Sequence, residues 1–237
     1  MESLLGIDWR WAWIEFNRLR NKPGDTDYWD DRSKDFKEHS GVSDYTDIFI
    51  RYLKLTPGQS VLDMGSGPGT IAIPLAKQGH PVIAADFSAG MRQMAQQRAE
   101  ELGLAGFEVR ALDWNEDWVA AGIQPKSVDV AIASRSTMVD DLGDALMKLD
   151  KTARHKVALT MVTEYSPRGF KALGSVQGAC KSYLPDYIYG INILLQLGIY
   201  PQLRYIDTIH GNGGETENKL VRWAFISWTP QAERQGQ

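Results

Sequence analysis

Apolar residues recur along the middle of the chain in short runs, and most of these runs are followed by a segment with helical spacing. The runs lie at 60–64, 81–86, 107–112, 127–134 and 156–162. Between them, the apolar spacing predicts helices over 70–78, 89–102 and 141–149. Short buried strands that alternate with helices are typical of a parallel sheet covered by helices on both faces.

The two ends of the chain depart from this alternation. Residues 204–209 and 220–228 have the pattern of strands joined by a turn-rich loop, which predicts an antiparallel hairpin. At the other end, two short helices separated by the NKPGD turn (21–25) are the simplest interpretation, and 42–54 has the spacing of a further helix. We therefore predict an α/β fold: a doubly wound Rossmann-like sheet, mostly parallel, of seven strands with an antiparallel C-terminal hairpin strand.

Composition and charge narrow the class of protein. Hydrophobic residues make up 43% of the 237 residues, which is enough for a sizeable core. The formal net charge of −4 disfavours a nucleic-acid partner, which usually requires a basic face. The single cysteine, Cys180, excludes an internal disulfide framework and fits a reducing cytosol. With no signal-like start and no run of about 20 apolar residues, we expect a cytoplasmic protein without a membrane span.

Three glycines at alternate positions follow the first predicted strand, in the pattern Asp63-x-Gly65-x-Gly67-x-Gly69. A glycine-rich turn between the first strand and the first helix is where sheets of this kind bind nucleotides. A dinucleotide fold would have its third glycine, or an alanine, at position 70, where this chain has Thr70. An acidic residue before the glycines suits a ligand with a positive amino group. A second interpretation of Asp63 stays open, in which it orients the loop backbone without touching a ligand.

Two further carboxylates end the next two predicted strands. Asp86 follows the second strand, where a carboxylate can accept hydrogen bonds from both hydroxyls of a ribose; a helix cap is the alternative. Asp113 and Trp114 follow the third strand, where they can contact the amino group and the ring of an adenine; a turn is the alternative for Asp113. A cationic amino acid, a ribose and an adenine together describe S-adenosylmethionine.

The segments VLDMGSGPGT, VIAADFSAGM and ALDWNEDW, in this order and spacing, resemble the first three motifs of the class I S-adenosylmethionine-dependent methyltransferases. The resemblance covers roughly 42–228 and includes that family's reversed seventh strand. It implies S-adenosylmethionine as cofactor and S-adenosylhomocysteine as product. Phe87 and Met91 would then flank the adenine, and Ser134 would lie near the methionine part and the substrate. The implied cofactor-binding set is Asp63, Gly65, Ser66, Gly67, Gly69, Asp86, Phe87, Ser88, Met91, Asp113, Trp114 and Ser134.

The resemblance also divides the chain into parts of a single methyltransferase domain. The expected parts are an N-terminal helical cap or lid (1–41), a cofactor-binding core (42–163), an insertion in the substrate region (164–200) and a terminal β-hairpin (201–237). Related enzymes with small substrates often carry a helix that closes over the cofactor. Trp29 and Phe36 are therefore candidates for a lid or substrate contact, with plain packing as the alternative. Glu164 and Tyr165 are further candidates for a substrate contact.

No residue stands out as catalytic. The four histidines lack metal-ligand spacing, so no metal site is expected. After the fourth strand the chain reads ASRSTM, where DNA amino methyltransferases carry an Asn/Asp-Pro-Pro-aromatic motif. We expect a small-molecule substrate, no nucleic-acid or membrane partner, and N-terminal tryptophans that serve the core or a homodimer contact. Two alternatives stay open: an NAD-dependent oxidoreductase with a similar sheet, and a non-catalytic cofactor-binding or scaffold protein.

Overall fold

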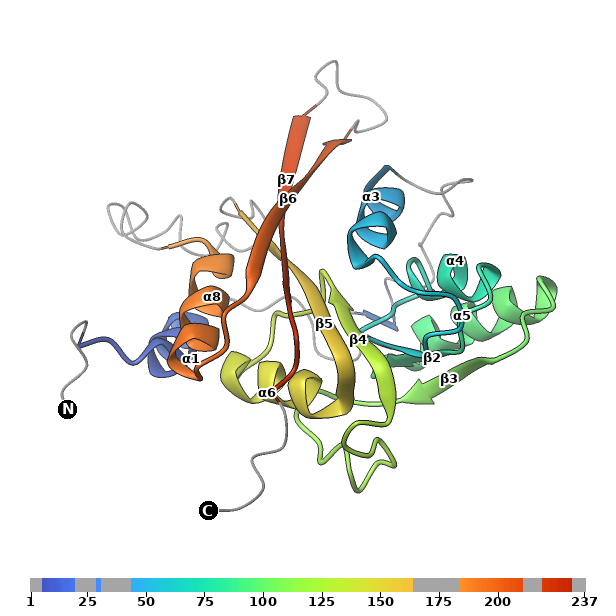
Figure 1. Ribbon diagram of the computed structural model, residues 1–237, viewed down its shortest axis with the longest axis horizontal. Coiled ribbons are helices and arrows are strands. Elements are labelled where there is room, and N and C mark those ends of the chain that lie inside the picture. The colour runs from blue at the N-terminus through green and yellow to red at the C-terminus, as the bar shows by residue number, and fades with distance from the viewer. Residues whose placement is uncertain (1–5, 20–28, 31–43, 164–183, 211–218, 232–237) are drawn as a thin grey trace.

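A computed structural model describes residues 6–19, 29–30, 44–163, 184–210 and 219–231 of the chain. The strands are β1 (Val61–Met64), β2 (Val82–Asp86), β3 (Phe107–Ala111), β4 (Val128–Ser134), β5 (Ala153–Val162), β6 (Gln202–His210) and β7 (Lys219–Trp228). They form one sheet in the order β3-β2-β1-β4-β5-β7-β6 (Figure 1). This confirms the predicted seven-stranded α/β fold.

The direction of the strands follows the prediction as well. The pairs β1–β2, β2–β3, β1–β4 and β4–β5 are parallel, whereas β7 is antiparallel to both β5 and β6. The strand order reverses between β1 and β4, because β2 and β3 lie on one side of β1 while β4 and β5 lie on the other. In open α/β sheets, ligands bind outside the carboxyl ends of the strands at such a reversal.

Helices cover both faces of the sheet (Figure 1). One face carries α6 (Leu142–Thr152) and α8 (Asp186–Gln196), with α1 (Trp9–Leu19) packed against these two helices. The other face carries α3 (Asp44–Leu53), α4 (Ala72–Lys77) and α5 (Ala89–Glu101). Among the described residues, no helix is both long and apolar enough to cross a membrane.

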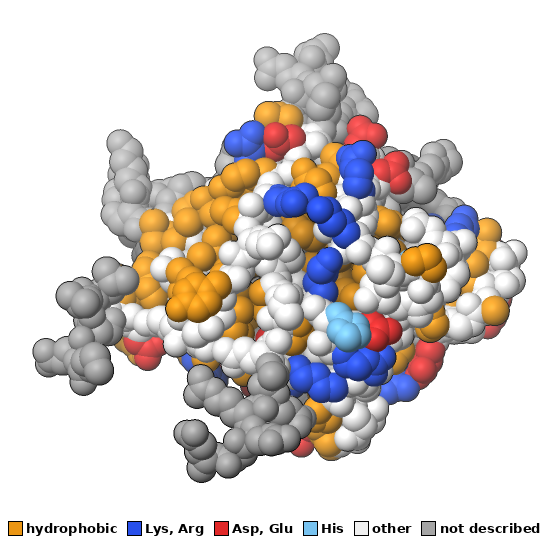
Figure 2. Space-filling model, viewed as in Figure 1, with side chains coloured by type: hydrophobic (Ala, Val, Ile, Leu, Met, Phe, Trp, Pro, Cys, Tyr) orange, Lys and Arg blue, Asp and Glu red, His pale blue; other side chains and the backbone are white. Residues whose placement is uncertain are grey.

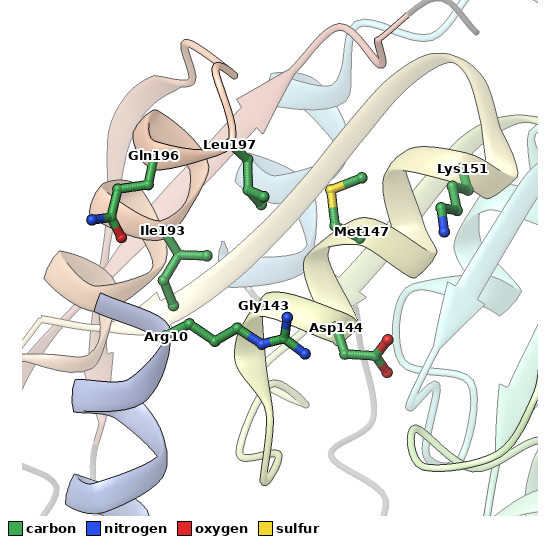
Figure 3. Close-up of a pocket in the computed structure, with 8 residues that line it drawn as sticks. All are labelled: Arg10, Gly143, Asp144, Met147, Lys151, Ile193, Gln196 and Leu197. Carbon is green, nitrogen blue, oxygen red and sulfur yellow. The ribbon is translucent and has the colours of Figure 1, made fainter. Parts of the chain in front are cut away.

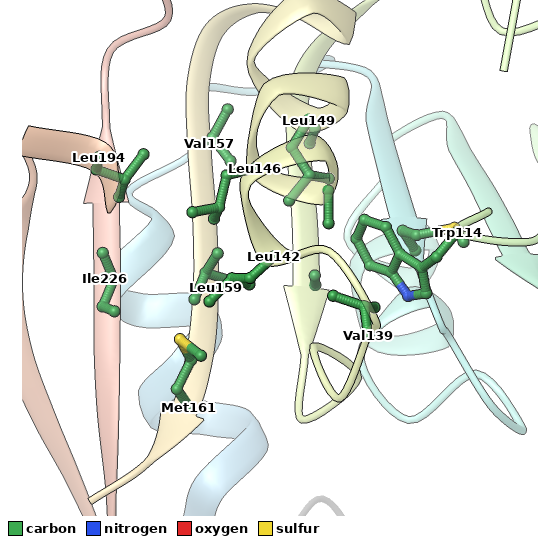
Figure 4. Packing of buried hydrophobic residues seen from close by; sticks show 14 of the residues in the cluster. Trp114, Val139, Leu142, Leu146, Leu149, Val157, Leu159, Met161, Leu194 and Ile226 are labelled. Carbon is green, nitrogen blue, oxygen red and sulfur yellow. The ribbon is translucent and has the colours of Figure 1, made fainter. Parts of the chain in front are cut away.

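The core beneath α6 shows why this segment is helical. Leu142, Leu146 and Leu149 recur at helical spacing, so they share one face of the helix and are all buried. They pack against alternate residues of β5, including Val157 and Leu159, which point to the same side of the sheet (Figure 4). The intervening residues of β5 point toward the α3 face. The helical spacing of apolar residues in α6 and their alternation in β5 therefore place these side chains in one buried layer between the helix and the sheet.

The N-terminal helix α1 is fastened to the segment that follows β4. The buried indole of Trp13 donates from Nε1 to the carbonyl of Val139 at 2.9 Å, and Asn17 Nδ2 donates to the same oxygen at 2.6 Å. Arg10 forms a two-pronged ion pair with Asp141, the N-cap of α6. Trp13 therefore belongs to the core, as one of the two sequence interpretations has it. Its neighbour Trp11 is 62% exposed.

Cations gather on one face of this acidic chain, where Figure 2 shows Lys and Arg side chains along the middle of the surface. Lys156 of β5 lies near Lys54 and Arg204. Its ammonium donates to the carbonyl of Leu53 at the end of α3, at 2.5 Å. Burial, together with the positive charges of Lys54 and Arg204, lowers the pKa of Lys156. The local field here is therefore positive although the net charge is negative.

Candidate functional site

The three glycines form the turn between β1 and α4. Their φ angles are +72° at Gly65, +55° at Gly67 and +82° at Gly69, a region that side chains with a Cβ rarely adopt. The amides of Gly65 and Ser66 both donate to the carbonyl of Ala85 in β2, at 2.8 and 3.0 Å. The turn is therefore tied to the neighbouring strand and requires glycine at these positions.

The space around the three glycines differs. A Cβ at Gly65 would lie 2.3 Å from the Cβ of Ser136, and a Cβ at Gly69 would lie 2.9 Å from Ile73 Cδ1. At Gly67 an added Cβ would meet no atom within 4 Å. The protein's own packing thus explains the first and third glycines. Gly67 instead borders open space next to the turn, where a ligand can approach the backbone.

Asp86 joins this turn to the start of α5. Its Oδ2 accepts a hydrogen bond from the Gly67 amide at 2.8 Å, and its Oδ1 accepts one from the Ser88 amide at 2.9 Å. Burial raises the pKa of this carboxyl, and the two amide hydrogen bonds oppose that shift. The N-cap of α5 is Ser88, whose Oγ accepts from Met91 N, so the helix-cap interpretation of Asp86 is wrong. Each carboxylate oxygen keeps a further lone pair for a ligand.

Asp63 lies at the end of β1, just before the turn, and its side chain is 1% exposed. Neither of its carboxyl oxygens has a hydrogen-bond partner in the part of the chain that the structure describes. Burial, and then the negative charge of Asp86, raises the pKa of Asp63 to about 7, while the nearby Ala72 amide opposes the shift. A buried carboxyl without compensation is costly, and groups of this kind cluster at functional sites.

The segment after β3 fits the sequence expectation only in part. Asp113 is half-buried, and its Oδ1 accepts from the amide of Asn115 at 2.7 Å, so the turn considered as an alternative is present. The Trp114 ring is 8% exposed and lies 5.4 Å from the Trp118 ring within the core. The expectation that Trp114 stacks on a ligand does not fit this packing, because the indole fills the core. An adenine contact at Asp113 stays a prediction.

A hydroxyl network fixes the end of β4. The buried Tyr45 hydroxyl lies 2.8 Å from Ser134 Oγ and 2.6 Å from Thr160 Oγ1 of β5. Burial raises the pKa of Tyr45, and the positive charge of Arg135 opposes the shift. The guanidinium of Arg135 lies 4.3 Å from the centre of the Tyr45 ring. Sequence reasoning missed Tyr45 and Arg135, because 90 positions separate these two residues along the chain and no local pattern joins them.

The loop after β4 also packs against the glycine turn. Ser136 Oγ donates to the carbonyl of Met64 at 2.7 Å, in addition to its close approach to Gly65. The ends of β1, β2 and β4 are therefore held together by direct contacts.

Part of the N-terminal region reaches this edge of the sheet. Asp30 accepts hydrogen bonds from the Ser88 hydroxyl and from the Gly90 amide, both at the start of α5. These bonds lower the pKa of Asp30, with the Ser88 contribution the largest. The preceding residue, Trp29, is also helical and is half-buried. Its role as a lid or substrate contact stays a prediction. The other such candidates, Phe36, Glu164 and Tyr165, lie outside the described residues.

The remaining members of the predicted set lie around the start of α5. Ser88 and Met91 are buried and Phe87 is half-buried. Arg92 donates to the carbonyls of Asp86 and Phe87 at 2.9 and 2.8 Å, and these hydrogen bonds stabilise the loop between β2 and α5. Sequence reasoning did not single out Arg92, because an arginine on an exposed helix has no distinctive pattern.

A separate cavity of about 270 Å³ lies between α1, α6 and α8 (Figure 3). It is lined by Arg10, Gly143, Asp144, Met147, Lys151, Ile193, Gln196 and Leu197. None of these residues belongs to the predicted set, so this cavity is distinct from the site at the glycine turn. Within the described ranges, no group of three or more His, Cys, Asp or Glu residues could hold a metal ion.

Comparison with known proteins gives consistent results. A family model described as a methyltransferase domain matches residues 55–179. A protein of Haemophilus influenzae, described as uncharacterised, is 34% identical over 216 residues, which cover 88% of this chain and 78% of that protein.

Solved structures share the fold. An S-adenosylmethionine-dependent methyltransferase from Aquifex aeolicus has a TM-score of 0.60 at 19% identity, over 84% of this chain and 98% of that one. The magnesium protoporphyrin IX methyltransferase of Synechocystis PCC 6803, solved with bound S-adenosylhomocysteine, has a TM-score of 0.55 at 21% identity, over 77% of this chain and 79% of that one. At such identities the likeness shows the fold.

Proposed function

The chain belongs to the methyltransferase-domain family and has the fold of the class I S-adenosylmethionine-dependent methyltransferases, and on this basis we propose that it transfers a methyl group from S-adenosylmethionine to a small-molecule acceptor. The observation that carries the proposal is the buried Asp63 carboxyl, which has no partner among the described residues and lies beside the glycine turn. A ligand ammonium bound next to this turn would compensate the carboxylate. The α-amino group of S-adenosylmethionine has that charge.

The other features of the turn suit the same ligand. Gly67 borders open space, so a ligand can lie against the backbone of the turn without meeting a side chain. The Asp86 carboxylate, held by two amides, keeps lone pairs that can accept from ribose hydroxyls. Asp113 has the same capacity for an adenine amino group at the end of β3. The residues present therefore fit the cofactor.

The chemistry explains why no catalytic group stands out. When bound, S-adenosylmethionine supplies a methyl group activated by a positively charged sulfur. The protein then has to hold donor and acceptor in line, and such positioning is worth about 7–11 kcal/mol of the barrier. The Tyr45–Ser134–Thr160 network and the Ser136 contact with β1 keep the ends of β1, β4 and β5 fixed, which suits this role. A general base is needed only if the acceptor must lose a proton first.

Calorimetric titration tests the cofactor. S-adenosylmethionine and S-adenosylhomocysteine should bind with micromolar dissociation constants, and NAD should not bind. Asp86→Ala should weaken binding tenfold or more, about 1.4 kcal/mol. Asp207→Ala is the matched control, since Asp207 is an exposed aspartate of β6 that pairs with Arg222, and it should bind like the wild type. Binding of NAD without binding of the sulfur ligands would overturn the proposal in favour of an oxidoreductase.

A turnover screen tests the acceptor. Formation of S-adenosylhomocysteine should depend on a small molecule from a panel of carboxylic acids, phenols, amines and thiols. Transfer RNA and a protein mixture serve as the competing acceptors. Methylation of either of these without methylation of any small molecule would contradict the small-molecule assignment.

A further inference from the structure

Arg135, the first residue after β4, has an unusual backbone and a side chain near two aromatic rings. Its φ is +58°, a left-handed conformation that is uncommon for residues other than glycine. Residues held in such conformations cluster at functional sites. Its amide donates to Thr160 Oγ1 at 3.1 Å, which helps to hold this conformation. The backbone of Arg135 is therefore held in place at the end of β4, where the residue is exposed.

The guanidinium of Arg135 rests on these aromatic rings. It lies 4.3 Å from the centre of the Tyr45 ring and 5.7 Å from that of Trp223. No acidic side chain pairs with it in the described parts of the chain. By contrast, Arg10, Arg154 and Arg222 each form an ion pair with an aspartate. The two contacts hold the Arg135 guanidinium against these rings, and among the described residues no hydrogen bond occupies its donors.

The position of Arg135 relates it to the acceptor. Its neighbour Ser136 packs against Gly65 and donates to the Met64 carbonyl, so Arg135 is one residue away from a direct contact with the glycine turn. Most of the proposed cofactor residues follow β1, β2 and β3, on one side of the sheet reversal or at β1 itself. Ser134, at the end of β4, is the one expected near both the methionine part and the substrate, and Arg135 follows it directly. With the cofactor over β1 to β3, the end of β4 borders the space left for the acceptor.

The chemistry of the side chain indicates what it binds. A planar guanidinium matches a carboxylate, which it can hold by two parallel hydrogen bonds. We propose that Arg135 binds a carboxylate of the methyl acceptor, so that the substrate is a small carboxylic acid. This inference rests on the proposed function. Among the described residues, Arg135 is the only cation that lies over the Tyr45 and Trp223 rings. One guanidinium suits a planar carboxylate better than a phosphate, which usually draws several donors.

The chain offers a matched control in Arg204. Its guanidinium lies 5.1 Å from the centre of the Tyr52 ring, in the same kind of cation–π contact. Tyr52 follows Tyr45 by seven residues, which is about 10 Å along α3 and away from the end of β4. If stacking on an aromatic ring were enough to bind a carboxylate, the two arginines would behave alike. The proposal requires that they differ.

Ligand-observed NMR tests the proposal with benzoate as the probe and benzamide as its neutral counterpart. Titrations use the full chain saturated with S-adenosylhomocysteine, as wild type and as Arg135→Met, Arg135→Lys and Arg204→Met. Benzoate should bind the wild type and Arg204→Met alike, at least tenfold more weakly to Arg135→Met, and with intermediate affinity to Arg135→Lys. Benzamide should bind all four proteins weakly. Circular dichroism confirms that each variant is folded.

Several outcomes would overturn the proposal: no binding of benzoate to the wild type, equal binding to Arg135→Met, or equal binding of benzamide and benzoate. Stronger binding of phenyl phosphate than of benzoate would replace the carboxylate with a phosphate. Titration of the same samples with S-adenosylhomocysteine distinguishes failure of the carboxylate site from failure of the proposed function. If that ligand binds every variant while benzoate does not discriminate among them, the carboxylate site is refuted and the proposed function stands. If it does not bind the wild type, the proposed function itself fails.

Discussion

The carboxylate of Asp86 accepts a hydrogen bond of 2.8 Å from the amide of Gly67, which joins the end of β2 to the turn between β1 and α4. Its second oxygen accepts from the Ser88 amide at 2.9 Å, where α5 begins. A single buried side chain therefore sets the distance between the two loops that flank the proposed cofactor site. The consequences of this relationship can be measured.

Asp86→Ala should lower both stability and cofactor affinity. Two amides lose their acceptor, and each such loss costs about 1–3 kcal/mol when the group is buried. We expect the free energy of unfolding in urea to fall by about 2–4 kcal/mol, with weaker binding of S-adenosylhomocysteine. Asp86→Asn keeps one acceptor oxygen and should be intermediate in both measurements. Wild-type stability and affinity in Asp86→Asn would show that the second carboxylate oxygen is not needed.

Gly65 and Gly67 should respond differently to alanine. Gly65→Ala places a Cβ 2.3 Å from Ser136 Cβ at a φ of +72°, so overpacking and backbone strain should together cost about 2–4 kcal/mol of stability. Adding Ser136→Gly should recover part of that loss. Gly67→Ala meets no atom within 4 Å and should cost about 1 kcal/mol through its φ alone.

Binding separates the two positions further. Gly67→Ala should weaken S-adenosylhomocysteine at least tenfold, because its Cβ would occupy the open space next to the turn. Urea unfolding and calorimetry on both variants check this pair of expectations. Unchanged affinity in Gly67→Ala would mean that the ligand does not lie against this part of the turn.

The stability of the protein should depend on pH through Asp63. In the unfolded chain this carboxyl loses its proton near pH ~4, whereas in the folded protein its pKa is raised to about 7. Between these values the folded state binds more protons than the unfolded state, so stability falls as pH rises. The loss amounts to at most about 4 kcal/mol.

Asp63→Asn removes this dependence, because an amide does not ionise. The variant should be more stable than the wild type at a pH of about 8, and the difference should shrink as pH falls toward about 4. Urea unfolding of both proteins across this range measures the effect. Asp86, whose pKa is also raised, titrates in both proteins, so the difference between the two curves reports Asp63 together with its repulsion from Asp86. Parallel curves would show that Asp63 is ionised in the folded state at neutral pH.

The α1 helix should influence the acceptor side of the site without affecting the cofactor side. Trp13 and Asn17 both donate to the Val139 carbonyl, in the segment that follows Arg135. Trp13→Phe loses one of these hydrogen bonds and part of a buried ring, which should cost about 2–3 kcal/mol of stability. Benzoate binding at Arg135 should weaken, while S-adenosylhomocysteine affinity should stay unchanged. Equal weakening of both ligands would indicate that α1 supports the whole edge of the sheet.

Much of the fold was predictable because the patterns that specify it are local. Apolar runs of strand length, the helical spacing between them and the glycine turn are each contained within short stretches of about twenty residues or fewer. Boundaries shifted where two elements meet directly: β5 begins at Ala153, immediately after α6, three residues earlier than its apolar run indicated.

Site residues were predictable only where they lie within one strand or in the turn that directly follows it, because the sequence pattern there is local. Asp63, Gly67 and Asp86 fall into that class. Tyr45 and Arg135 do not, since their contact depends on the first turn of α3 lying at the carboxyl ends of β4 and β5. Trp114 shows the converse problem: an aromatic beside a strand end suits a ligand or the core equally well, and only the packing against Trp118 decides between them.

The reversed direction of β7 has a practical consequence. Because β7 runs against β5, with Val162 opposite Trp223 and Val157 opposite Trp228, its last residues lie at the edge of the sheet opposite the glycine turn. Trp228 is anchored there by a 2.8 Å hydrogen bond from its Nε1 to Asp150 Oδ1. A sensor surface or affinity resin coupled to the chain beyond Trp228 would therefore lie on the side of the sheet away from the glycine turn. Immobilised protein should bind ligand as readily as protein in free solution.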